Sequence, residues 1–90
     1  MNRSTIYEYL KSTDLYPLYY SKTGYHIRFV LQRYQTFCRV NFGYGFVRGV
    51  ESIYLCGNEL VIESKYGDMK INLYYKDIQE LEVYIEEDSD

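Results

Sequence analysis

The residues that could support catalysis or metal binding are few and poorly placed for either task. His26 is the only histidine, and the two cysteines, Cys38 and Cys56, lack the spacing of a metal-binding or redox pair. A structural zinc site needs four ligands of the Cys or His type, and this chain has two cysteines and one histidine. We therefore expect no metal and no cofactor, and we interpret both cysteines as reduced, small apolar residues.

Two further patterns resemble parts of catalytic sites. Gly43-Tyr44-Gly45 is rich in glycine, but it lacks the third glycine and the following helix of a phosphate-binding loop. Glu80 and Glu82 alternate on the outward face of a predicted strand, where water keeps carboxylates ionised and unable to donate a proton. His26 lies in an alternating segment that is typical of a partly exposed strand. The sequence therefore predicts a protein that is not an enzyme.

Charge is divided unequally between the two halves of the chain. Residues 1–48 carry seven Lys or Arg and two Asp or Glu, whereas residues 49–90 carry three and eleven. The formal charges of the halves are therefore +5 and −8, which sum to the net charge of −3. Such asymmetry indicates charged partners.

The length of 90 residues, 47% of them hydrophobic, predicts a single domain that spans residues 1–90. No apolar run approaches the roughly 20 residues of a membrane span, and none of signal-peptide length follows the N-terminus. We expect a cytoplasmic, intracellular protein with no membrane partner.

A short helix is the first element that the pattern predicts. Thr5 and Glu8 have the spacing of a capping box, in which each side chain accepts a hydrogen bond from an unpaired backbone N–H. Apolar residues then follow at helical spacing from Ile6, and Pro17 disfavours helix at the residue before it. A helix over residues 5–13 is expected.

Residues 25–85 are expected to form antiparallel strands. The segment Gly24–Phe46 fits both helical and strand periodicity, but its aromatic and β-branched content favours strands with a turn near Tyr34–Gln35. In the second of these strands Tyr44 and Phe46 fall on the predicted core face, and glycines interrupt the other face. Such glycines usually mark a bend where a sheet curls.

The register of the next hairpins follows from their turns. Gly57-Asn58 is a two-residue turn of a kind that requires positive φ, and residues 65–68 form a four-residue loop. Both turns place the same apolar residues on one face, and a slip of one residue would reverse every side chain. The expected pairs are Leu55 with Leu60, Ile53 with Ile62, Ile62 with Ile71, Leu60 with Leu73, and Glu63 with Lys70. A corner at residues 76–79 leads to the last strand, and residues 86–90 form an acidic tail.

Together these elements predict a mainly β, α+β fold, in which a short N-terminal helix precedes four or five strongly bent antiparallel strands in a meander or small barrel. The residues that carry a family resemblance are Phe46-Val47-Arg48-Gly49-Val50-Glu51-Ser52-Ile53, Glu59-Leu60-Val61-Ile62, Lys70-Ile71-Asn72-Leu73 and Lys76-Asp77-Ile78. This pattern resembles small Sm-like barrels, including the YolD-like bacterial group. The resemblance implies an open-edged barrel that pairs edge strands into a homo-oligomer. The Sm family's RNA-contacting Asp and Met-Asn pair is replaced by Gly67-Asp68-Met69-Lys70, so a uridine pocket is not implied.

Binding to a basic protein is the function that we expect from the acidic half. Carboxylates two residues apart on a strand lie roughly 6.6–6.8 Å from each other, close to every second phosphate of a DNA strand, whose phosphates rise roughly 3.4 Å. In type, the chain is similar to phage-encoded antagonists and DNA mimics. Outward tyrosines would complete the contact. The expected partner-binding residues are Tyr54, Tyr74, Glu80, Glu82, Tyr84, Glu86 and Glu87.

Two other interpretations remain open. Arginines interleaved with aromatic residues in the basic half are typical of modules that bind single-stranded RNA or DNA. The residues concerned are Arg28, Arg33, Arg39 and Arg48. Alternatively, the acidic residues are a solubilising surface with no partner.

Overall fold

The computed structural model describes the whole chain except residues 14, 20, 22–23, 38–39, 65–68 and 86–90, and it describes residues 33–37 and 40–42 by their backbone alone. The elements in chain order are helix α1 (Arg3–Ser12), strands β1 (Tyr25–Phe37), β2 (Val40–Val47), β3 (Val50–Cys56), β4 (Glu59–Ser64) and β5 (Lys70–Tyr74), the 3-10 helix η1 (Tyr75–Asp77), and strand β6 (Ile78–Ile85). The mainly β fold with a short N-terminal helix is therefore confirmed.

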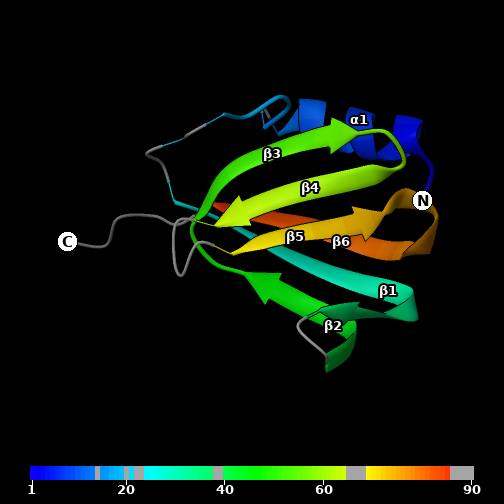
Figure 1. Cartoon of the computed structure of the whole chain (residues 1–90). Helices are drawn as coiled ribbons and strands as arrows, with labels where there is room; N and C mark the ends of the chain where they lie inside the picture. The colour runs from blue at the N-terminus through cyan, green and yellow to red at the C-terminus, as the bar shows by residue number, and fades with distance from the viewer. Residues whose placement is uncertain (14, 20, 22–23, 38–39, 65–68, 86–90) are drawn as a thin grey trace.

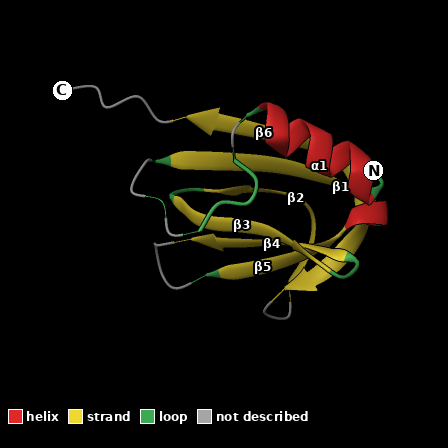
Figure 2. Cartoon of the chain, turned by 90° about the horizontal axis from the view of Figure 1, so that it is seen from above, coloured by secondary structure: helices red, strands yellow, loops and turns green. Residues whose placement is uncertain are grey.

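The strands of the described residues form two antiparallel sheets that pack as two layers (Figures 1 and 2). One sheet has the order β2-β1-β6, and the other has the order β3-β4-β5. After η1, strand β6 leaves the meander and pairs with β1, so that Arg28 lies opposite Glu82. The last strand thus belongs to the sheet that the chain began, and six strands share the two layers.

A single cluster of buried hydrophobic residues lies between the sheets and α1. Ile27 and Phe29 project into it from β1, while Ile53 and Ile62 project from the opposite sheet. The helix contributes Ile6 and Leu10, which lie one turn apart on one face and are fully buried. Figure 2 shows α1 packed beside β6 and β1. No helix in the described part of the chain is long and apolar enough to cross a membrane.

The predicted register of the β3-β4-β5 sheet is confirmed at every pair. Leu55 and Ile53 lie opposite Leu60 and Ile62, and Glu63 lies opposite Lys70. The remaining predicted pairs, Ile62 with Ile71 and Leu60 with Leu73, also form. Gly57 has φ of 58°, as the predicted turn requires. The loop over residues 65–68 lies outside the described residues.

The predicted capping box at Thr5 is wrong. Helix α1 begins at Arg3, and its N-cap is Asn2, whose Oδ1 accepts hydrogen bonds from the Thr5 backbone N–H at 2.8 Å and from Thr5 Oγ1 at 2.9 Å. Asparagine is at least as good an N-cap as threonine, and starting at Asn2 adds helical residues. Thr5 therefore donates to the cap and is not the cap itself.

The predicted turn near Tyr34–Gln35 is also wrong. Strand β1 continues through this point to Phe37, and its pairing with β2 shifts register between Val30 and Gln35. An irregularity of this kind bends a strand without ending it. The sequence therefore marks a bend in β1 where we expected a reversal of the chain.

The predicted core face of β2 is its solvent face. Tyr44 and Phe46 are 75% and 49% exposed, whereas Val47 is buried. Gly45 lies opposite Phe29, and a Cβ added to Gly45 would come within 2.5 Å of the Phe29 ring. The ring of Phe29 therefore fills the space beneath β2, which forces the aromatic residues of β2 outward. Cys56, expected to be a small apolar residue, is an exposed thiol, and Cys38 lies outside the described residues.

Candidate functional site

The outward surface of the β2-β1-β6 sheet gathers the exposed aromatic and charged side chains of three strands. Its central strand alternates, because Ile27 and Phe29 are buried in the core while the residues between and beside them face outward. The register then places the side chains of β6 and β2 on either side of these residues. We call this surface the outer face and define it by His26, Arg28, Val30, Tyr44, Phe46, Glu80, Glu82 and Tyr84.

Arg28 stands at the centre of the outer face and binds two carboxylates. Its Nη2 donates to Glu82 Oε1 at 2.7 Å and to Glu80 Oε2 at 2.8 Å. The second oxygen of Glu82 accepts a hydrogen bond from the Tyr84 hydroxyl. These three hydrogen bonds join four side chains into one network across β1 and β6, in which Arg28 lies between the two acidic side chains.

The network changes the proton affinities of Arg28, Glu82 and Tyr84. Hydrogen bonds from Glu82 and then Glu80 raise the pKa of Arg28, so its guanidinium stays charged. Arg28, followed by the Tyr84 hydroxyl, holds the pKa of Glu82 below its ordinary value. Because the Tyr84 hydroxyl donates a hydrogen bond to the Glu82 carboxylate, the pKa of Tyr84 is raised. The network therefore favours the charged forms of Arg28 and Glu82 and the protonated form of Tyr84.

An aromatic cluster flanks the arginine. The Phe46 ring lies 5.6 Å from the His26 ring and 6.2 Å from the Tyr84 ring, measured between centroids. The guanidinium of Arg48 lies 6.0 Å from the Phe46 centroid, within range of a cation–π contact. Tyr84 is 43% exposed and Tyr44 is 75% exposed, so much of the cluster is open to solvent.

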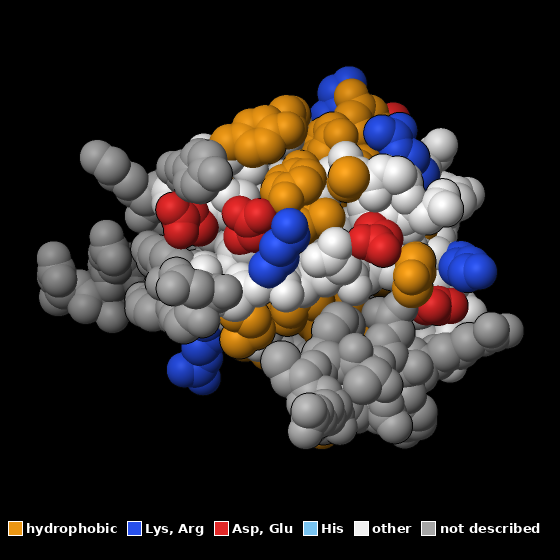
Figure 3. Space-filling model, in the orientation of Figure 1, with side chains coloured by type: hydrophobic (Ala, Val, Ile, Leu, Met, Phe, Trp, Pro, Cys, Tyr) orange, Lys and Arg blue, Asp and Glu red, His pale blue; other side chains and the backbone are white. Residues whose placement is uncertain are grey.

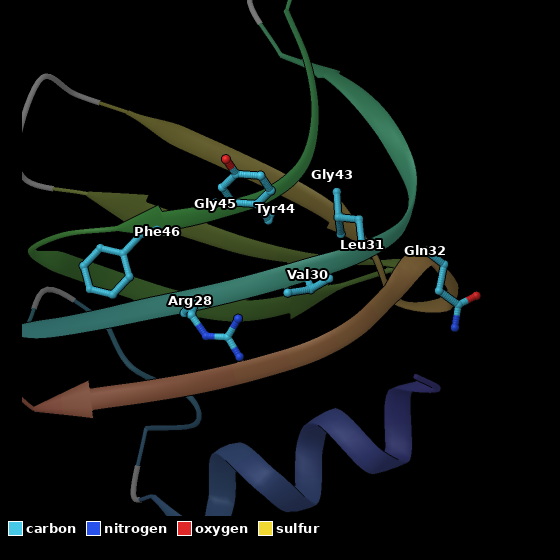
Figure 4. Close-up of a pocket in the computed structure, with 8 residues that line it drawn as sticks. All are labelled: Arg28, Val30, Leu31, Gln32, Gly43, Tyr44, Gly45 and Phe46. Atoms are coloured by element: carbon cyan, nitrogen blue, oxygen red, sulfur yellow. The ribbon is translucent and has the colours of Figure 1, made fainter.

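A hollow of about 560 Å³ opens between β1 and β2 beside this cluster. Figure 4 shows Tyr44 and Phe46 rising from β2, with Arg28 and Val30 on the neighbouring β1. The backbone of Gly43 and Gly45 also lines it. The hollow is largely apolar, with the guanidinium of Arg28 at its side.

His26 has a structural role at the edge of the outer face. Its Nδ1 accepts a hydrogen bond from the Gly49 backbone N–H at 3.2 Å, and Gly49 has a φ of 61° at the corner between β2 and β3. Half-buried His26 thus holds the chain where it passes from one sheet to the other. This position fits the sequence prediction of a partly exposed strand histidine.

The structure divides the predicted partner-binding residues between two opposite surfaces. Glu80, Glu82 and Tyr84 belong to the outer face, whereas Tyr54 and Tyr74 lie on the outward surface of the β3-β4-β5 sheet. Figure 3 shows that second surface, where hydrophobic side chains gather among acidic and basic ones. The predicted residues therefore do not form one continuous contact, and Glu86 and Glu87 lie outside the described residues.

The tyrosine patch predicted on the second surface is partly covered. Val61, which lies opposite Tyr54 in the sheet, is only 2% exposed. Tyr19 stacks on Tyr54 with 6.0 Å between ring centroids, and the Tyr54 hydroxyl donates to Glu63 at 3.0 Å. The segment before β1 therefore covers part of the surface that sequence alternation left open.

The four arginines predicted to bind nucleic acid have different environments. Arg28 is held by its two carboxylates, and Arg48 lies over Phe46. The side chain of Arg33 and the whole of Arg39 lie outside the described residues. Of the two arginine side chains of this set that the structure describes, Arg48 is the one that lies over an aromatic ring.

Tyr44, Phe46 and His26 are members of the outer face that sequence reasoning missed. The pair of glycines at the alternate positions of β2 could have identified Tyr44 and Phe46. Positions without a side chain leave space for a large side chain of a neighbouring strand, so the glycines mark the core-facing side of β2 and the two aromatic residues face outward. Among the described residues, no group of three or more His, Cys, Asp or Glu is placed to hold a metal ion.

Comparison with protein-family models gives no match, and neither the curated proteins nor the solved structures contain a match to this chain.

Proposed function

We propose that this chain is a non-enzymatic protein-binding module that docks on its partner through the outer face. The observation that carries the proposal is the exposure of Tyr44, Phe46 and Tyr84 beside a hollow of about 560 Å³. Exposed apolar patches mark interaction surfaces, and the centres of protein interfaces are enriched in aromatic residues and arginine. An aromatic or aliphatic side chain of the partner would fill the hollow between β1 and β2.

The hydrogen bonds of Arg28 favour burial of this surface by a protein. A charge that loses water without a partner is strongly destabilising, but Arg28 already has two carboxylate acceptors within 2.8 Å. A docking protein would therefore cover the centre of the outer face without leaving an unpaired cation. The paired charges then contribute to specificity, and the surrounding rings contribute most of the affinity.

A basic partner is the second part of the proposal. One arginine between two glutamates leaves one unit of negative charge at the β6 side of the outer face. A lysine or arginine of the partner would share these carboxylates with Arg28. Antagonism of a nucleic-acid-binding protein by charge mimicry is the narrower form of this idea, and it requires the partner's cations to displace Arg28 from Glu80 and Glu82.

Binding of single-stranded RNA or DNA, as in an Sm-like module, is the alternative. The contact between Arg48 and Phe46 favours it, because a ring beside a cation can stack a base and hold a phosphate. Arg28 weighs against it, since an approaching phosphate would meet two carboxylates that already bind the same guanidinium.

Affinity capture with matched surface variants tests the proposal. The tagged chain, Tyr44→Ser and Phe46→Ser are incubated with extract of the cells that encode it, after nuclease treatment, and the retained proteins are quantified. Tyr19→Ser is the control, because Tyr19 is 61% exposed on the other side of the molecule. We expect one or more proteins that the wild type and Tyr19→Ser retain equally and that both outer-face variants lose.

Three outcomes would contradict parts of the proposal. If all variants retain the same proteins, the outer face is not the docking surface. If retention disappears with nuclease and single-stranded oligonucleotide binds in a salt-dependent manner, the nucleic-acid alternative replaces the proposal. If Glu80→Gln and Glu82→Gln together leave capture unchanged, charge mimicry is excluded while docking through the aromatic residues stands.

A further inference from the structure

The strands at the edges of the two sheets differ in whether other parts of the chain cover them. The free edge of β6 is covered, because the Val83 backbone N–H donates to the Tyr9 hydroxyl of α1 at 2.9 Å and the Ile78 carbonyl accepts from the Met1 nitrogen at 2.6 Å. The free edge of β3 is covered by the segment before β1, in which Leu18 forms an antiparallel bridge with Ile53. Such covering protects strand edges from other chains.

Strand β5 is different, because no described residue pairs with it on the side away from β4. The Ser64 N–H donates to the Met69 carbonyl at 2.8 Å, and the Tyr75 N–H donates to the Asn58 carbonyl at 3.1 Å. Both bonds lie on the β4 side of the chain, one at each end of β5. In an antiparallel strand the N–H and C=O of each residue point to the same neighbouring strand, and successive residues alternate between the two sides. The N–H and C=O groups directed away from β4 therefore belong to Lys70, Asn72 and Tyr74, whose side chains are also exposed.

We propose that β5 pairs with β5 of a second copy of this chain, in antiparallel register about a two-fold axis at Asn72. The pattern of free backbone groups is symmetric about this residue, since Lys70 and Tyr74 lie two positions to either side. Asn72 then faces Asn72 of the second copy, and Lys70 faces Tyr74. All outward N–H and C=O groups of the three residues would be paired, and the two β3-β4-β5 sheets would become one six-stranded sheet.

The side chains along this edge suit the same register. Lys70 of one copy comes opposite Tyr74 of the other, which places an ammonium beside an aromatic ring. Met69, which is 48% exposed, comes to the far end of β5 in the second copy. A hollow of about 410 Å³ lies at that end, between the start of α1 and residues 74–76, and it would receive the thioether side chain.

Strand β2 is a poorer candidate for this contact. Among the described residues β2 also pairs on one side only, with β1, but its register shifts between Val30 and Gln35. The pairing of β5 with β4 is uninterrupted from Lys70 to Tyr74. A regular edge of five residues can form a continuous ladder with its own copy, although its small area predicts a reversible dimer that dissociates on dilution.

Cysteine cross-linking tests the register directly. Asn72→Cys and Tyr74→Cys are each introduced with Cys38→Ser and Cys56→Ser, and the full chain is oxidised at high and low protein concentration. Opposed hydrogen-bonded residues have Cα atoms about 5.5 Å apart, within the range of a disulfide. In the proposed dimer the two copies of residue 74 are four positions apart, roughly 13 Å. We expect a disulfide-linked dimer from Asn72→Cys at high concentration and much less from Tyr74→Cys.

Asn72→Pro supplies a second test, with sedimentation velocity as the readout. The Asn72 N–H points away from β4, so proline removes an edge donor while leaving the β4 ladder intact. Removing both donors at the two-fold axis should raise the dissociation constant about tenfold or more, with the folded circular dichroism spectrum retained. The proposal is overturned if the wild-type chain is monomeric at every concentration, if Tyr74→Cys cross-links as readily as Asn72→Cys, or if dimerisation is unaffected by Asn72→Pro in a folded chain. None of these results depends on the outer face.

Discussion

Gly45→Ala is the substitution whose effect the structure predicts most sharply. Gly45 lies opposite Phe29 in the β1–β2 ladder, and a Cβ at this position would be 2.5 Å from Phe29 Cζ and 2.9 Å from Cε1. Favourable carbon–carbon contacts begin near 3.5 Å, so the ring must move by about 1 Å. Phe29 is only 3% exposed and packs among other core residues, which leaves it little space to move.

Two effects of opposite sign determine the size of the change. An alanine in an ordinary strand is more favourable than a glycine by roughly 0.5–1 kcal/mol, because glycine loses more backbone entropy on folding. Overpacking a well-filled core costs about 1–3 kcal/mol. We therefore expect Gly45→Ala to lower the free energy of unfolding by up to about 2.5 kcal/mol, with a central value of about 1 kcal/mol. For a domain of this size each kcal/mol corresponds to roughly 4–8 °C in Tm.

Thermal and urea unfolding at neutral pH measure the effect, and a double-mutant cycle identifies its cause. Phe29→Leu alone should destabilise the chain by opening space in the core. In the Gly45→Ala background the same change should cost less, because the smaller side chain relieves the overlap. An increase in Tm for Gly45→Ala, or strict additivity of the two changes, would refute the close packing of β2 on Phe29.

Three other predictions concern single contacts. Asn2→Ala should destabilise the chain by about 1 kcal/mol in urea unfolding, since it removes the N-cap of α1. Tyr9→Phe should accelerate hydrogen exchange at the Val83 amide, whose acceptor it removes, and should cost about 0.5–1.5 kcal/mol. Because Arg28 lowers the pKa of Glu82, this carboxylate adds stability above the ordinary glutamate pKa of about 4.3, and the contribution is lost as pH falls through the lower pKa of the folded chain. In Arg28→Gln, an NMR titration should show the pKa of Glu82 returning toward its ordinary value, and an unchanged pKa would contradict the ion pair.

The parts of the fold that could be predicted from sequence are those fixed by local chemistry. The β3-β4-β5 register follows from Gly57, which provides the positive φ of the turn, and from apolar alternation on both sides of it. The helix was predicted in the right place but not with the right first residue, because Asn2 and Thr5 are both good N-caps and only the structure shows which side chain accepts. Local patterns thus identified elements better than their ends.

The outer face could not be predicted because it depends on pairing between distant segments. Glu82 meets Arg28 only when β6 returns to β1, and alternation alone gives no partner for a strand. Alternation also fails to distinguish the two faces of β2, since the residues that face the core include Gly45. The large aromatic residues were therefore assigned to the core by their hydrophobicity, although Phe29 already occupies that space.

Site-specific photocrosslinking within the cells that encode this chain tests the proposed protein-binding function most directly. A benzophenone amino acid is placed at Tyr44 or Tyr84 on the outer face, and at Tyr19 on the opposite surface as the control. The account predicts that the first two positions give the same covalent adduct with one cellular protein, while the Tyr19 position does not give it. Adducts of equal yield from all three positions, or an adduct from Tyr19 alone, would contradict docking through the outer face.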